Sequence, residues 1–108
     1  MTLSEYQAEA LKTAIYPKEI GIIYSALGMT GESGEVADKV KKTIRDNGGV
    51  FDEATRLEIA KEVGDVLWYI AAMSDDLGLS LEEIARMNLD KLRSRATRHR
   101  LHGTGDNR

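Results

Sequence analysis

Apolar residues recur at helical spacing along most of the chain, and no segment shows the strict alternation of a β-strand. Between residues 62 and 77 the apolar side chains share one side of a helical wheel, at Val63, Val66, Leu67, Ile70, Met73 and Leu77. Similar stripes precede and follow this one, at Val36, Val40 and Ile44 and at Leu81, Ile84, Leu89 and Leu92. The stripes predict an all-α fold, an antiparallel four-helix bundle with a modest core.

Helix-breaking residues at Pro17, Gly48–Gly49 and Gly78 divide this pattern into segments. The expected helices cover residues 3–16, about 18–20 to 47, 53–77 and 80–97.

Two capping-box motifs mark the predicted starts of the first and last helices. They are Ser4-x-x-Gln7 and Ser80-x-x-Glu83. We therefore expect one helical domain over residues 1–97. Residues 98–108, which are basic and contain glycine, are expected to form an extended tail.

Charge and composition narrow the classes of function. The net charge is −3, but residues 1–85 hold 16 acidic and 8 basic side chains, while residues 86–108 hold 2 and 7. A duplex-DNA-binding protein needs a basic face, so nucleic acid is not an expected partner. With no signal segment and no apolar run of membrane-spanning length, we expect a cytoplasmic protein without membrane contact.

The shortage of nitrogen and sulfur ligands bears on the kind of metal the chain could hold. Cysteine is absent, and the two histidines, His99 and His102, lie near the C-terminus. A Ser-His-Asp triad or a zinc site is therefore poorly supported. Carboxylates would have to supply the ligands, which favours hard ions such as Mg²⁺ or Mn²⁺.

Two acidic pairs are the main chemical motif. Glu32-x-x-Glu35 and Glu62-x-x-Asp65 each place two carboxylates on one helix face. On facing helices the pairs would meet as four carboxylates, an arrangement that needs a cation. The alternative is that both pairs lie on solvated faces. Glycines beside the acids, at Gly31, Gly34 and Gly64, favour close approach of a ligand or backbone, although packing would also explain them.

Basic and aromatic residues accompany the acids on the same helix faces. Lys39 and Lys42 share the face of Glu32 and Glu35, where they could bind phosphate or only compensate Glu35. Beside the second acidic pair, Tyr69 could pack on a sugar or cover the core.

The neighbouring Trp68 suits either a nucleobase or a subunit interface, and we favour the interface. Near the C-terminus Asn88, Lys91 and Arg95 form a polar stripe suited to phosphate oxygens and a nucleoside edge. The stripe would also suit an ordinary basic helix end that complements the helix dipole.

Three blocks in this order resemble the MazG-type, all-α nucleoside triphosphate pyrophosphohydrolases. They are GESGEVADKVKK at 31–42, KEVGDVLWYI at 61–70 and NLDKLRSR at 88–95. The tail HGTGDNR, residues 102–108, resembles the ending of short, phage-type members.

The resemblance implies a bundle that assembles into dimers or tetramers with sites between subunits. It also implies Mg²⁺-dependent hydrolysis of a (deoxy)nucleoside triphosphate to the monophosphate and pyrophosphate, with Mn²⁺ as a substitute. By motif, Glu32, Glu35, Glu62 and Asp65 become the metal ligands, and Glu35 or Glu62 would also accept the proton. The resemblance also assigns phosphate contacts to Lys39, Lys42, Lys91 and Arg95, and nucleoside contacts to Tyr69 and Asn88.

Two other functions remain open at the level of sequence. The same fold could act on phosphoribosyl-ATP, or the chain could be a non-enzymatic helical dimerisation module. No motif selects a base or distinguishes deoxyribose from ribose.

Overall fold

The computed structural model describes residues 1–108 and contains helices but no strands. The elements are α1 (Leu3–Leu11), a short 3₁₀ helix η1 (Lys18–Ile20), α2 (Gly21–Asp46), α3 (Glu53–Asp76) and α4 (Leu81–Thr97). The predicted all-α class is therefore confirmed. None of these helices combines the length and apolar character needed to cross a membrane.

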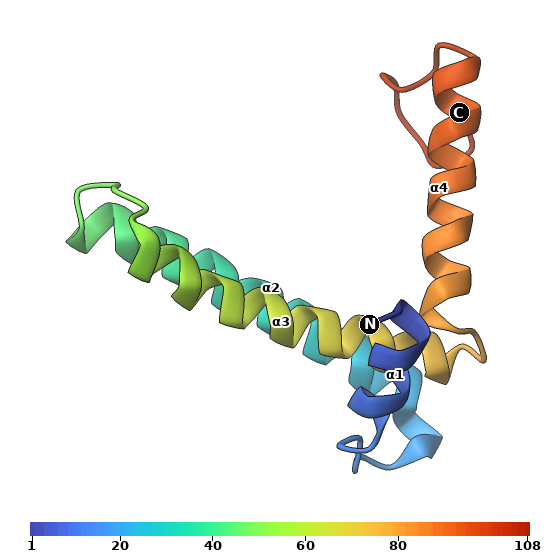
Figure 1. Ribbon diagram of the computed structural model, residues 1–108, viewed down its shortest axis with the longest axis horizontal. Coiled ribbons are helices and arrows are strands. Elements are labelled where there is room, and N and C mark those ends of the chain that lie inside the picture. Colours follow the sequence, from blue (N-terminus) through green and yellow to red (C-terminus); the bar gives the residue numbers. More distant parts are fainter.

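The two longest helices form an antiparallel hairpin that dominates the molecule (Figure 1). Its turn contains Gly48 and Gly49, both with positive φ, followed by Asp52, whose side chain accepts a hydrogen bond from the Thr55 amide (2.9 Å) and caps α3. α1 packs across the open end of the hairpin, and α4 leads away from it (Figure 1). Within one chain the four helices do not all lie side by side.

The start of α1 differs from the prediction. Thr2, not Ser4, is the N-cap, and it forms the capping box with Glu5. Gln7 is instead buried between helices. Its Nε2 donates to the carbonyls of Ala71 (3.1 Å) and Leu79 (3.4 Å), while its Oε1 accepts from the Leu81 amide (2.9 Å). This side chain ties α1 to the end of α3 and the start of α4.

The end of α1 also differs, because the helix stops at Leu11 and not at residue 16. Trp68 of α3 donates its indole N–H to the Ala10 carbonyl (3.2 Å) and to the Thr13 hydroxyl (2.8 Å). Trp68 therefore anchors the end of α1 in its own chain. The expectation of a nucleobase or a subunit interface at this residue is not needed to explain it.

A buried polar network joins the start of α2 to the end of α3. The Tyr16 and Ser25 hydroxyls both donate to Oδ2 of Asp76, at 2.7 and 2.6 Å. Gly21 allows this approach, because a Cβ there would lie 2.3 Å from Oδ1 of Asp76. The network fixes the start of α2 against the end of α3, directly after the chain turns between α1 and α2.

Much of the predicted apolar face is uncovered in a single chain. Several predicted core positions are exposed: Ile44, Val63, Leu67, Leu77, Leu89 and Leu92. The radius of gyration is 16.7 Å, against roughly 13 Å for a compact domain of this length. The accessible surface of 7617 Å² exceeds by about 1,600 Å² that of a compact 12.0 kDa monomer. One chain alone does not close the bundle.

The tail folds back on α4 and is not extended as expected. Asp106 returns to α4, where one carboxylate oxygen lies 2.6 Å from Lys91 Nζ and 3.3 Å from an Arg95 nitrogen. Arg95 also donates to the Asp106 carbonyl. Arg108 donates to three backbone carbonyls of the same segment, those of Arg100, Leu101 and Gly105.

Candidate metal centre

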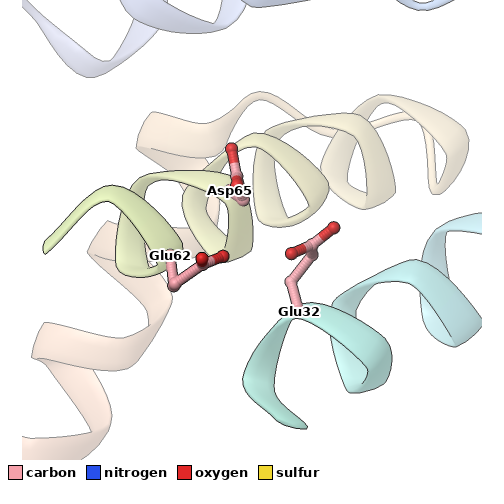
Figure 2. Close-up of side chains that lie close together, drawn as sticks. All are labelled: Glu32, Glu62 and Asp65. Atoms are coloured by element: carbon pink, nitrogen blue, oxygen red, sulfur yellow. The ribbon is translucent and has the colours of Figure 1, made fainter. Parts of the chain in front are cut away.

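Three carboxylates meet on the seam between α2 and α3, near the middle of the hairpin (Figure 2). Glu32 comes from α2, and Glu62 and Asp65 come from α3. One carboxylate oxygen from each residue lies within 4.8 Å of the others. The predicted convergence of the two acidic motifs is therefore present in the structure for these three residues.

The electrostatics of the three acids are those of crowded like charges. Glu32 is half-buried, and burial raises its pKa above the usual value. The negative charges of Asp65, Glu62 and then Glu35 raise the pKa further. A cation between these groups would remove both penalties.

Lys39 provides partial compensation from within the chain. Its Nζ lies 3.3 Å from a Glu62 oxygen and 3.3 Å from a Glu58 oxygen. Hydrogen bonds to these two carboxylates raise the pKa of Lys39 above its usual value, so it stays charged. One ammonium group does not balance three acids, and it contacts only one of them.

The donor set fits Mg²⁺. Mg²⁺ takes six oxygen ligands at 2.0–2.1 Å, some of them waters, so adjacent ligands lie about 2.9 Å apart and opposite ligands about 4.2 Å apart. The three carboxylate oxygens, which lie within 4.8 Å of one another, would move closer together to bind one ion. A larger ion such as Mn²⁺ would need less movement.

Glu35, the fourth predicted ligand, lies outside the group of three. It is exposed and makes no hydrogen bond or ion pair, although its charge acts on Glu32. Its free carboxylate lies near the three acids but is not one of the group.

A groove of about 490 Å³ continues the seam from the acids towards the hairpin turn. Lys39 and Lys42 line its α2 side, and Glu58 lines its α3 side. Lys42 binds Asp38 (2.7 Å), and hydrogen bonds from Lys42 and Lys41 lower the Asp38 pKa to about 2. Of the two predicted lysines, only Lys39 contacts one of the three clustered carboxylates, that of Glu62.

The predicted residues of α4 lie apart from the acids, because α4 leads away from the hairpin (Figure 1). Asn88 and Lys91 border a small surface depression together with Asp106. Arg95 is only 5% exposed and is held by the tail. Within one chain, Asn88, Lys91 and Arg95 do not join the metal centre.

Within one chain, none of the three glycines singled out from the sequence packs against a neighbouring element. A Cβ at Gly31, Gly34 or Gly64 would meet nothing within 4 Å in a single chain. Gly28, which sequence reasoning missed, packs directly against the ring of Tyr69. Its place four residues before Glu32, on the same face of α2, was the available signal.

Two comparisons with known proteins find matches to this chain. Residues 25–99 match the family model described as the MazG nucleotide pyrophosphohydrolase domain. The chain is 41% identical over 114 aligned positions to the Gene 37 protein of Mycobacterium phage L5, and the alignment covers 100% of both chains. The name of that protein does not describe an activity. No solved structure matches the chain.

Proposed function

Because this chain belongs to the MazG nucleotide pyrophosphohydrolase family, we propose that it hydrolyses (deoxy)nucleoside triphosphates to the monophosphate and pyrophosphate with Mg²⁺. Membership carries the general class, a nucleotide pyrophosphohydrolase that depends on a divalent metal. The triphosphate substrate, Mg²⁺ and a cytoplasmic role in nucleotide-pool control are the proposal. The observation that supports it best is the group formed by Glu32, Glu62 and Asp65 on two helices.

The three clustered carboxylates would hold the ion. When bound, Mg²⁺ supplies a Lewis acid that polarises phosphate oxygens and lowers the pKa of a coordinating water. The neighbouring residues would accept a proton from the water and offset the charge of the phosphates.

Glu35 has a free carboxylate beside the cluster, so we assign it the proton of the water that attacks the α-phosphorus. The bond between the α-phosphorus and the bridging oxygen breaks, and pyrophosphate leaves. Lys39 stands at the border of the acids and the groove, where its charge would offset that of the phosphate oxygens. Lys42 follows it along the groove.

Assembly with further copies of the chain belongs to the proposal. The excess accessible surface of about 1,600 Å² and the exposed apolar side chains at Val63 and Leu67 support a homodimer or homotetramer. In such an assembly Asn88, Lys91 and Arg95 would serve the metal centre of another copy. Tyr69 is already packed against Gly28 of α2, and a nucleoside contact from it belongs to the proposal as well.

Product analysis tests the reaction. The full chain is incubated with each natural ribo- and deoxyribonucleoside triphosphate and Mg²⁺, and the products are separated and measured. We expect monophosphate and pyrophosphate in equal amounts, and a loss of activity of at least 100-fold in Glu32→Gln and Glu62→Gln. Glu53→Gln is the matched control, because Glu53 lies on the same helix as Glu62 but is exposed and unpaired.

Other outcomes would reject the proposal in distinct ways. Nucleoside diphosphate with orthophosphate would contradict the predicted bond. Activity restricted to phosphoribosyl-ATP would change the substrate class. Inactivity towards all these compounds, with equal behaviour of wild type and Glu62→Gln, would favour a non-enzymatic dimerisation module.

A further inference from the structure

The carboxylates of the metal centre belong to a row of contacts between the antiparallel helices α2 and α3. Gly28 lies one turn before Glu32 on α2, and Tyr69 lies one turn after Asp65 on α3. On the other side of the acids, Lys39 of α2 binds Glu62 and Glu58 of α3. The Gly28–Tyr69 contact and the Lys39 ion pairs therefore flank the acidic group from opposite sides.

The contact at Gly28 leaves no room for a side chain. A Cβ at this position would lie 2.1, 2.4 and 2.5 Å from Cε1, Cζ and Cδ1 of Tyr69, whereas real Cβ contacts essentially never fall below 3.0 Å. Two neighbouring aromatic rings restrict how far the Tyr69 ring can turn aside. The Trp68 ring stands edge-on against it at 4.9 Å between centroids, and the Tyr24 ring lies at 6.3 Å.

A side chain at Gly28 would therefore push α2 and α3 apart at this contact. Glu32 is four residues away on the same face of α2, so its carboxylate would move with the helix. Glu32 would then lie farther from Glu62 and Asp65 than it does now, when one carboxylate oxygen from each residue lies within 4.8 Å of the others. Carboxylates spread further apart would no longer share one small ion.

From this geometry we infer that the Gly28–Tyr69 contact is a positioning device, which holds α2 close enough to α3 for one divalent ion to bind all three carboxylates. Tyr69 acts through the helix spacing and not as a ligand. The inference rests on the proposed metal centre and adds two residues that determine its affinity.

Direct metal binding is the first test. Binding of Mn²⁺ to the full chain is measured by the electron paramagnetic resonance signal of the free ion. Gly28→Ala is expected to weaken Mn²⁺ binding at least tenfold. Gly34→Ala is the matched control, because it makes the same change in the same helix with nothing within 4 Å. It should stay within twofold of wild type.

A double-variant cycle tests whether the ring is the obstacle. In a Tyr69→Ala background the ring atoms are absent, so adding Gly28→Ala should change Mn²⁺ affinity less than threefold. In the triphosphate assay, Gly28→Ala should raise the Mg²⁺ concentration for half-maximal activity while leaving KM for nucleotide unchanged at saturating Mg²⁺. An equal loss of affinity from Gly28→Ala in both backgrounds would overturn the inference.

Further outcomes separate this inference from the proposed function. If the wild type does not bind Mn²⁺, the metal centre itself is wrong. If the wild type binds Mn²⁺ and Gly28→Ala binds equally well, only the positioning role is wrong. Should Gly28→Ala fail to fold by circular dichroism, the double variant must regain both fold and Mn²⁺ binding, and its failure to do so would also overturn the positioning role.

Discussion

Neutralising Glu32 should stabilise the metal-free protein and at the same time remove its response to Mg²⁺. Glu32 lies within 4.8 Å of two other carboxylates. In a water-like dielectric each such pair repels by about 0.9 kcal/mol, and salt at physiological strength reduces this to about 0.5 kcal/mol. Glu32→Gln removes both repulsions, so the gain is about 1 kcal/mol. For a domain of this size that corresponds to about 4–8 °C in Tm.

The pH dependence gives the sign of the same effect. Because the pKa of Glu32 is raised in the folded chain, its ionisation costs stability as pH rises from the unfolded value of 4.5 through the folded value. The advantage of Glu32→Gln should therefore be present at pH 7.5 and fade towards pH 4.5.

Thermal unfolding by circular dichroism measures both effects, in EDTA and in Mg²⁺. At 100 times its dissociation constant a bound ion adds about 2.7 kcal/mol to the wild type, and Glu32→Gln should lose most of that gain. Glu53→Gln should behave as wild type in both buffers. A Glu32→Gln protein that is less stable in EDTA, or that keeps the full Mg²⁺ response, would refute the reasoning.

Three further predictions follow from other contacts. Gln7→Ala, which leaves the buried Leu81 amide without its partner, should lower the free energy of unfolding by about 2–3 kcal/mol in urea titrations; a change below 0.5 kcal/mol would contradict the tie between α1, α3 and α4. Lys39→Met should lower kcat/KM about tenfold or more and tighten Mn²⁺ binding, because Glu62 is released; unchanged kinetics would exclude Lys39 from the site. Asp106→Asn should lower KM for nucleotide if Lys91 and Arg95 contact phosphate; a KM equal to that of wild type would leave them as anchors of the tail.

Short sequence signals predicted the helix bounds well where no contact with a distant part of the chain changed them. The bounds of α2, α3 and α4 follow from a glycine pair, from Gly78 and from the Ser80–Glu83 capping box, which the structure contains. Failure came at α1, where Gln7 resembled a capping residue but serves a tertiary role. No periodicity reveals that a polar side chain is required by carbonyls some 64 residues away.

The site was predictable to the extent that it depends on helix periodicity. Spacing placed Glu32 on one face and Glu62 with Asp65 on another, and the hairpin brought them together. Spacing could not decide that Glu35 stays outside, since that depends on the rotation of each helix about its axis. Nor could it show that Asp106 occupies Lys91 and Arg95, because a coil segment has no period from which its path can be read.

The structure separates glycines that lie on the helix seam from glycines that are merely next to the acids in sequence. Gly31 and Gly34 face open space in one chain, so close approach of a ligand or backbone to them stays a prediction. Gly28 is farther from the acids in sequence but lies on the seam, where the Tyr69 ring occupies the volume of a side chain. The position of a residue on the helix face therefore counts for more than its distance along the chain. By the same argument, Asn88, Lys91 and Arg95 cannot be assigned to the centre by motif order, because α4 does not share the seam (Figure 1), and only the arrangement of a second copy can bring them to it.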